Sequence, residues 1–265
     1  MQKTKMLNRI SLVLFSSLLL VASSCKKDDK PNPQPEPQSK LTEYKDGEDF
    51  VRFQYNTDGT IKKATVKNEI NTDNDIVDFT LTYNDQKVIT EMNSSSGEKI
   101  VPVYANGVLE RADIFMAGER TGYTNYVFEN GYMKKATIYV GSGVEFEPIL
   151  EFDYNYNANG NVTQGVIMIG TDVPGQMLRA GHVNLQHDTK TNPLFAFRDF
   201  FALLWQGPSK NNVTVEDVFD ENQVQTDKNV YTYNYNIKGF PNGATVKSGL
   251  PGQPQTESTV GFVYQ

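Results

Sequence analysis

Cysteine is almost absent from this sequence, because Cys25 is the only one among its 265 residues. A single thiol can form no disulfide within the chain, and it cannot build a cysteine-rich metal site. Histidine is nearly as scarce: His182 and His187 are the only two, and their odd spacing would place them on opposite faces of a strand. We therefore predict neither a metal site nor a cofactor.

A membrane-spanning run is also lacking, since a helix needs about 20 apolar residues to cross a bilayer. The apolar run at residues 10–22 is shorter, follows three basic side chains and ends in small residues just before Cys25. That order is typical of a secretory signal peptide. We predict that residues 1–24 are the signal peptide and that Cys25 begins the mature chain.

Positive charge is in deficit as well. The whole chain has a net charge of −7, and loss of residues 1–24 removes three basic side chains and no acidic one. The mature chain then has 22 basic against 32 acidic residues, a net charge of −10. Because binding to a phosphate backbone depends on Lys and Arg, we expect no nucleic-acid partner.

The residues around Cys25 resemble a known signal. Residues 21–25, Val-Ala-Ser-Ser-Cys, resemble the lipobox of bacterial lipoproteins, with Ala22 where a leucine is usual. The next four residues resemble the export signal that sends lipoproteins of the Bacteroidota to the outer face of the outer membrane: Lys26, Lys27, Asp28 and Asp29. The resemblance implies lipid such as palmitate on Cys25 and an outer-membrane protein facing the exterior, with the periplasmic face as the alternative. An ordinary signal peptide followed by a solvated charge run is the competing interpretation.

Residues 25–40 form the predicted anchor and tether. Four prolines alternate with polar residues between positions 31 and 37, which prevents a helix or a strand ladder. Such a segment is an extended spacer of about 3.1 Å per residue. It would lift the following domain away from the lipid surface.

Residues 41–265 repeat one pattern and are predicted to form a single domain. In each unit large residues alternate, which is typical of a strand with one covered face, and Asn-Gly, Asp-Gly or Lys-Gly then favours a tight hairpin. Ala64, Ala136 and Ala244 recur after the turns, opposite bulky aromatic residues of the preceding strand. The pattern predicts an all-β fold of about 12 to 16 strands, an antiparallel hairpin meander forming one large curved or partly rolled sheet. The units span residues 50–61, 77–85, 101–109, 126–133, 150–162 and 230–240, with a half-unit at 260–264.

These units resemble tyrosine–aspartate (YD-type) hairpin repeats, and more closely the repeat-built domains of unknown function in surface lipoproteins of the Bacteroidota. The resemblance covers roughly residues 44–265. Asparagine mostly replaces the aspartate, as in Tyr55-Asn56 and Tyr156-Asn157. The family implies a broad antiparallel sheet and no established activity.

One segment, at about residues 193–205, breaks the alternation and contains the only tryptophan. Pro193 suits a first helical turn with Asn192 as its cap. Leu194, Phe197 and Phe201 fall on one helical stripe. We predict a short helix or compact loop that covers one face of the sheet.

No stretch carries a catalytic signature. Residues 71–75 have the oxygen spacing that begins a calcium loop but lack its glycine and its final carboxylate, so we interpret them as a polar hairpin tip. The Gly-Ser-Gly at 141–143 is interpreted as a turn rather than a nucleophile elbow. We predict no catalytic residue.

Surface aromatic residues leave one ligand hypothesis open. Tyr123, Tyr126, Tyr132 and Tyr139 lie close together in the sequence, with amides nearby. Aromatic rings beside amides can hold sugar rings, but alternating tyrosines also fill the faces of such a sheet.

The leading hypothesis is a non-enzymatic, lipid-anchored envelope protein with a binding or structural role. Its partners would be the membrane, through the lipid, and a glycan or protein ligand. The first alternative is a glycan-binding accessory lipoprotein of a nutrient-uptake system. The second is a hydrolase with a carboxylate site beside the Phe-rich insertion.

Overall fold

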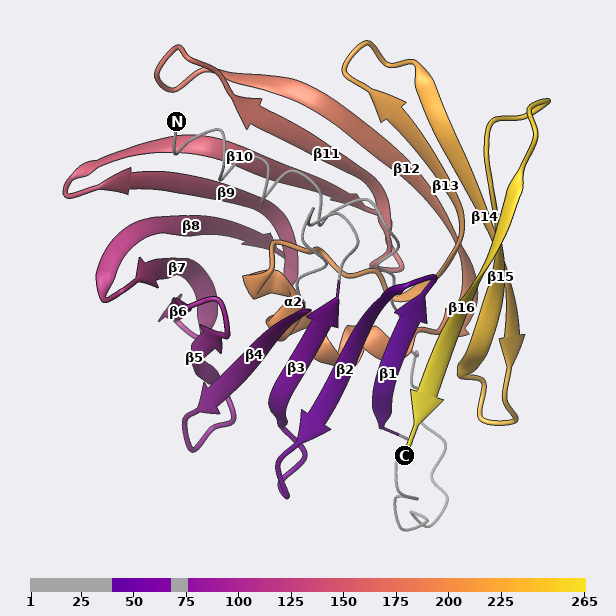
Figure 1. Cartoon of the computed structure of the whole chain (residues 1–265), viewed down its shortest axis with the longest axis horizontal. Helices are drawn as coiled ribbons and strands as arrows, with labels where there is room; N and C mark the ends of the chain where they lie inside the picture. The colour runs from indigo at the N-terminus through magenta and orange to yellow at the C-terminus, as the bar shows by residue number, and fades with distance from the viewer. Residues whose placement is uncertain (1–39, 68–75) are drawn as a thin grey trace.

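Within the residues that the structure describes, sixteen antiparallel strands follow one another, each paired with the next (Figure 1). The computed structural model describes residues 40–67 and 76–265. The predicted signal peptide, Cys25, the charged residues 26–29, the proline tether and the polar tip at 71–75 lie outside the described residues.

The strands are β1 (Leu41–Asp46), β2 (Asp49–Tyr55), β3 (Ile61–Lys67), β4 (Ile76–Tyr83), β5 (Ile89–Ser94), β6 (Glu98–Ala105), β7 (Val108–Met116), β8 (Glu119–Glu129), β9 (Tyr132–Ser142), β10 (Glu145–Tyr156), β11 (Val162–Gly170), β12 (Met177–Thr191), β13 (Asn211–Asp220), β14 (Gln225–Tyr235), β15 (Pro241–Ser248) and β16 (Thr256–Tyr264). The 3₁₀ helix η1 (Pro193–Phe197) and the helix α2 (Arg198–Leu203) lie between β12 and β13.

The sheet closes on itself. Strand β1 pairs with β16, with Tyr44 opposite Phe262, and the backbones of Lys40 and Gln265 exchange hydrogen bonds of 3.2 and 2.9 Å. The predicted all-β antiparallel meander and its strand number are confirmed, but the sheet closes into a complete barrel rather than the predicted curved or partly rolled sheet. Closure removes the two unpaired edges that such a sheet would expose.

The turns that follow the even-numbered strands form one end of the barrel, here called the repeat rim. They span residues 56–60, 84–88, 106–107, 130–131, 157–161 and 236–240, and the segment 192–210 and the chain ends Lys40 and Gln265 lie at the same end. The opposite rim consists of the described turns 47–48, 95–97, 117–118, 143–144, 171–176, 221–224 and 249–255.

An asparagine side chain accepts backbone hydrogen bonds in three of the five-residue turns of the repeat rim, those at residues 84–88, 157–161 and 236–240. In the turn after β10, the Asn157 side-chain oxygen accepts from the backbone N–H groups of Asn159 and Asn161 at 3.0 and 3.1 Å. Gly160 has a φ of 78°, a conformation that glycine adopts without strain. Only the side-chain oxygen is needed, so asparagine serves as well as the aspartate of the YD-type pattern.

The repeated tyrosine before that asparagine ties neighbouring strands together. Tyr55 at the end of β2 donates to the carbonyl of Leu41, at the start of β1. Tyr156 donates in the same way to Met133 at 3.1 Å. Tyr264 at the end of β16, which no asparagine follows, makes the same kind of bond to Pro241 at 2.8 Å. Each bond satisfies a hydroxyl that would otherwise be half-buried without a partner.

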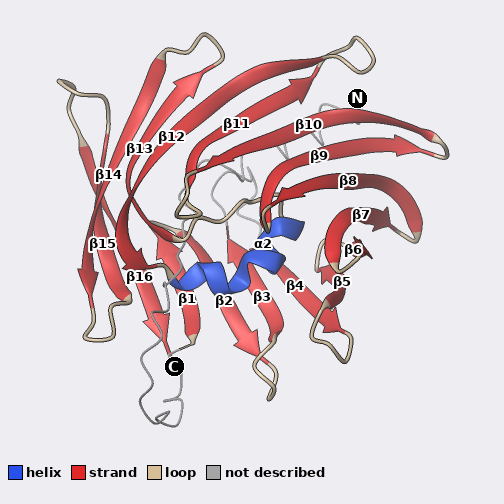
Figure 2. Cartoon of the chain, turned by 180° about the vertical axis from the view of Figure 1, so that it is seen from behind, coloured by secondary structure: helices blue, strands red, loops and turns tan. Residues whose placement is uncertain are grey.

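The helical segment packs against the inner face of the barrel, between the walls (Figure 2). Asn192 caps η1 by accepting from the N–H of Leu194 at 3.0 Å, as predicted. The predicted insertion is therefore present, and the face it covers is the inside of a barrel. Among the described residues, no helix is long and apolar enough to cross a membrane.

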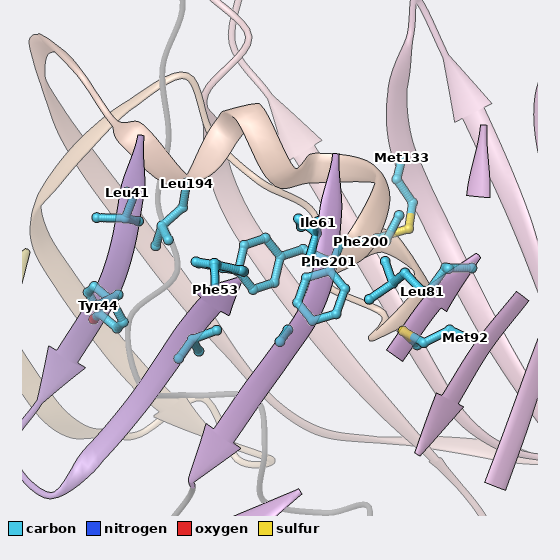
Figure 3. Close-up of a cluster of buried hydrophobic side chains, with 14 of the residues drawn as sticks. Leu41, Tyr44, Phe53, Ile61, Leu81, Met92, Met133, Leu194, Phe200 and Phe201 are labelled. Atoms are coloured by element: carbon cyan, nitrogen blue, oxygen red, sulfur yellow. The ribbon is translucent and has the colours of Figure 1, made fainter. Parts of the chain in front are cut away.

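Apolar side chains of the wall and the helix meet inside the barrel (Figure 3). Phe200 and Phe201 are 1% exposed, and Phe53 on β2 lies 6.1 Å and 6.4 Å from their ring centroids. Small residues stand opposite large ones across the strands, with Ala64 facing Phe53 and Ala136 facing Tyr126. The predicted large–small pairing is confirmed at these positions, and it leaves room for the helix.

Candidate functional site

An aromatic ladder, formed by Tyr123, Tyr139, Phe146 and Arg120, stands on the outer face of β8, β9 and β10. Tyr123 and Tyr139 lie opposite each other on neighbouring strands, with ring centroids 4.6 Å apart and planes 9° apart. Phe146 meets Tyr123 edge-on at 5.3 Å. The Arg120 guanidinium lies 4.7 Å from the Tyr123 ring and 5.0 Å from the Phe146 ring.

A carboxylate fixes the arginine of this aromatic ladder. Asp113 pairs with Arg120 at 2.5 Å and with Arg111 at 3.2 Å. Burial raises the pKa of the Tyr139 hydroxyl, which stays neutral at physiological pH. Tyr123 is surrounded by the chain's own rings and guanidinium, so Tyr139 is the member best placed to meet a ligand.

The other two predicted aromatic residues lie elsewhere. Tyr126 is 6% exposed and points into the barrel. Tyr132 stands at the repeat rim, where it stacks on Tyr156 at 5.0 Å with the Lys210 ammonium 5.5 Å from its ring. The structure thus brings together two of the four tyrosines, because β8 and β9 place Tyr123 and Tyr139 opposite each other and turn Tyr126 inward.

Inside the barrel, the segment after α2 is fixed by hydrogen bonds to the wall. The Trp205 indole donates to the Thr124 hydroxyl at 2.8 Å, and Tyr154 donates to the Trp205 carbonyl at 2.8 Å. Thr124 is fully buried. Two different strands therefore hold this one residue.

A buried polar network continues where the segment rejoins the sheet. Asn161 donates from its side chain to Asn211 at 2.8 Å and accepts from the Asn211 backbone N–H at 2.6 Å. The Ser209 hydroxyl, fully buried, accepts from the Val162 N–H at 2.8 Å. Sequence reasoning did not find this network, because its partners are about 50 residues apart.

His187 belongs to the same network. Its Nε2 lies 3.1 Å from the Ser209 hydroxyl, and burial lowers the pKa of the imidazole to about 4. Neighbouring Asp188 accepts from Tyr235 and from the Asn212 side chain. Serine, histidine and aspartate are the residue types of a hydrolytic triad, but Ser209 is closed off from substrate and Asp188 bonds to other partners.

The second histidine lies on the other side of the wall, as its spacing predicts. His182 stacks on Phe219 on the outer face, with centroids 4.5 Å apart. Within the ranges the structure describes, no group of three His, Cys, Asp or Glu residues could hold a metal ion.

Glu216 is a carboxylate buried inside the barrel. It is 5% exposed and accepts from Asn229 at 3.0 Å and from Tyr231 at 3.2 Å. Burial raises the pKa of Glu216 to about 7, since desolvation disfavours the charged form.

The remaining predicted features have ordinary structural roles. Residues 141–143 lie at the hairpin between β9 and β10, and Gly143 has a φ of 62°, as expected of a turn. Glu151 and Asp153 on the outer face both pair with Lys135, at 2.6 and 3.2 Å. The acid of the helical insertion, Asp199, is exposed and lies 3.6 Å from Arg198.

Comparison with known proteins shows the fold. No family model and no curated protein matches this chain. The chain is similar to the crystal structure of a porin-like protein from Bacteroides uniformis ATCC 8492, with a TM-score of 0.56, 13% identity and coverage of 87% of this chain and 99% of that one. A porin-like protein from Bacteroides vulgatus ATCC 8482 matches with a TM-score of 0.46, 11% identity and coverage of 86% and 99%. A TcdB2–TccC3 toxin structure matches with a TM-score of 0.29, 13% identity and coverage of 82% of this chain and 12% of that one.

Proposed function

We propose that this chain is a lipid-anchored, non-enzymatic protein of the cell envelope whose barrel stands in water outside the bilayer. In this proposal Cys25 carries the lipid, and the protein stands on the outer face of the outer membrane. The proposal rests on the lipobox-like residues 21–25 and on one observation from the structure, the charged outer wall of the barrel.

Ion pairs cross the outer face between neighbouring strands. Lys63 on β3 pairs with Asp78 on β4 at 2.7 Å. Lys228 on β14 pairs with Asp217 on β13 at 2.7 Å, in a distant part of the barrel wall. A membrane barrel has an outward apolar band about 25 Å tall, and a Lys or Arg in its middle costs about 2–4 kcal/mol. The inner face around the helical segment is apolar instead, which suits a barrel surrounded by water.

The Bacteroides uniformis neighbour is a porin-like protein, which is compatible with the envelope but does not carry a channel function to this chain. A porin needs a polar lumen, whereas Phe200 and Phe201 pack here against an apolar inner wall. The hydrolase alternative loses one candidate site, because Ser209 beside His187 is fully buried.

Replacing the anchor residue tests the proposal. In cells, Cys25→Ala should move the protein from the membrane fraction to the soluble fraction after washing with salt, and it should abolish incorporation of labelled palmitate. A Ser24→Ala variant keeps the thiol and serves as the control. Incorporation of labelled palmitate by Cys25→Ala at the wild-type level, or by neither protein, would refute the lipid anchor.

A second candidate function, glycan binding, is favoured by the outward position of Tyr139 in the aromatic ladder. Affinity electrophoresis in gels containing bacterial and plant polysaccharides would test it. Retardation by one polysaccharide should be lost in Tyr139→Ala and kept in Tyr132→Ala, because Tyr132 lies at the repeat rim. If no polysaccharide retards the wild-type protein, this candidate is rejected.

A further inference from the structure

The two rims of the barrel carry opposite charge. In the repeat rim as defined above, five cationic side chains stand against three side-chain carboxylates, Asp58, Asp85 and Asp199. The cations are Lys40, Lys87, Arg198, Lys210 and Lys238. The described turns of the opposite rim contain three carboxylates, Glu48, Asp172 and Glu221, and no Lys or Arg.

The chain enters the barrel at the cationic end. Lys40 is fixed there by its two backbone hydrogen bonds to Gln265, which also close the barrel between β1 and β16. Fifteen residues lead from Cys25 to Lys40, and at about 3.1 Å per residue they reach roughly 45 Å when extended. A tether of this length permits contact between the repeat rim and the surface that holds the lipid but does not enforce it, and the repeat rim is the end nearest the point of attachment.

The charges of the two rims favour one orientation of the tethered barrel relative to the lipid surface. An anionic headgroup surface attracts nearby Lys and Arg side chains and repels carboxylates, and this force acts within a Debye length, about 8 Å at physiological salt. Because the described turns of the opposite rim contain carboxylates and no Lys or Arg, a barrel that turned this rim to the surface would be repelled. We propose that the barrel rests on an anionic lipid surface through its repeat rim and presents its opposite rim to the exterior. This inference rests on the proposed lipid anchor.

Exposed valines at the opposite rim suggest an alternative, the reverse orientation, in which the apolar tips of these turns would enter the lipid. Val144 is 96% exposed and Val173 is 58% exposed. Glu145 follows Val144 directly, and Asp172 precedes Val173. Insertion of either tip would bring a carboxylate into the headgroup region, so these valines are better placed for contacts outside the membrane.

Single introduced cysteines can report the orientation, because the lipid consumes the only native thiol. The purified lipoprotein would carry a fluorophore at Gln86→Cys or Ala158→Cys on the repeat rim, or at Val144→Cys or Val173→Cys on the opposite rim. Each would be reconstituted into equimolar phosphatidylcholine and phosphatidylglycerol vesicles with a headgroup quencher, and into phosphatidylcholine vesicles with the same quencher. All four sites are exposed.

On the anionic vesicles, we expect repeat-rim probes to be quenched several-fold more than opposite-rim probes. Molar salt, or the added pair Lys87→Glu and Lys238→Glu, should reduce this ratio toward its value on neutral vesicles. Equal quenching at the two rims, or stronger quenching at Val144→Cys, would overturn the orientation while leaving the anchor intact. Failure of the protein to float with neutral vesicles would refute the anchor, and this orientation with it.

Discussion

Phe197 of η1 stacks on Phe53 of β2, with ring centroids 4.4 Å apart and planes 25° apart. This contact joins the helical insertion to the barrel wall, and Phe53 is 4% exposed. Phe53→Ala should lower the free energy of unfolding by about 3–5 kcal/mol, because it removes the ring and leaves a cavity. Urea denaturation followed by the fluorescence of Trp205, the single tryptophan, would measure the loss.

A double-mutant cycle isolates the stacking itself. Phe197→Leu and Phe53→Leu, singly and together, should show a coupling of about 0.5–1.5 kcal/mol beyond the lost area. Phe115→Leu on the outer face is the control and should change stability little. If the two inner substitutions prove additive, the helix does not depend on this contact.

Glu216 predicts a loss of stability as the pH rises. Burial raises the pKa of Glu216 from 4.5 in the unfolded chain to about 7 in the fold, so the folded state binds the proton more tightly. Stability from this group is fully present below pH 4.5 and declines as the pH rises through about 7, by roughly 3 kcal/mol in total. Glu216→Gln should remove this decline and make the protein more stable than wild type at pH 8, as measured by thermal unfolding. A variant that is destabilised equally at pH 5 and pH 8 would show that Glu216 is not protonated in the fold.

His187 predicts the opposite slope. Burial lowers the pKa of the imidazole from 6.5 to about 4, so the folded state favours the neutral ring. Stability from this group is present above pH 6.5 and is lost as the pH falls toward 4, by roughly 3 kcal/mol. His187→Gln keeps a polar atom near Ser209 but cannot titrate, so its stability should vary less between pH 4 and pH 6.5 than that of the wild type.

The two titrations oppose each other between about pH 4.5 and 6.5, so the wild-type protein should show little net slope there. Glu216→Gln alone should then become more stable with rising pH over this range, and His187→Gln alone should become less stable. A flat profile in both single variants would contradict both assignments. The double variant is the matched control and should be flat.

Local patterns predicted much of this fold, because strand and turn preferences act over a few residues. The alternation before Asn157 and the glycine at 160 specify one hairpin, and Asn192-Pro193 specifies the start of a helix. Closure of the barrel could not be predicted from these local patterns. The pairing of Tyr44 with Phe262 joins residues at the two ends of the chain, and no local signal distinguishes a closed barrel from a curved sheet.

In the candidate sites, too, contacts between neighbouring strands could be predicted from the sequence, and contacts between distant residues could not. Tyr123 and Tyr139 meet because their strands are neighbours in a hairpin, which sequence reasoning can anticipate. Tyr126, three residues from Tyr123, faces inward, and an odd spacing on a strand already indicates this. By contrast, the bond from Trp205 to Thr124 crosses 81 residues, and its existence depends on where the helix lies inside the barrel.

Two glycines of the repeat rim test how closely the turns pack. Gly160 has a φ of 78°, and a Cβ there would lie 2.3 Å from the Tyr132 hydroxyl; Gly131 has a φ of 79° and open space around the same position. Gly131→Ala should therefore cost only the strain of a left-handed residue, about 1–2 kcal/mol. Gly160→Ala should cost distinctly more, because Tyr132 must also leave its stack on Tyr156. Equal losses in urea denaturation would mean that Tyr132 moves freely. Partial rescue of Gly160→Ala by Tyr132→Ala would identify the Tyr132 side chain as the main obstacle, since a Cβ at Gly160 would also lie 2.7 Å from its ring carbon.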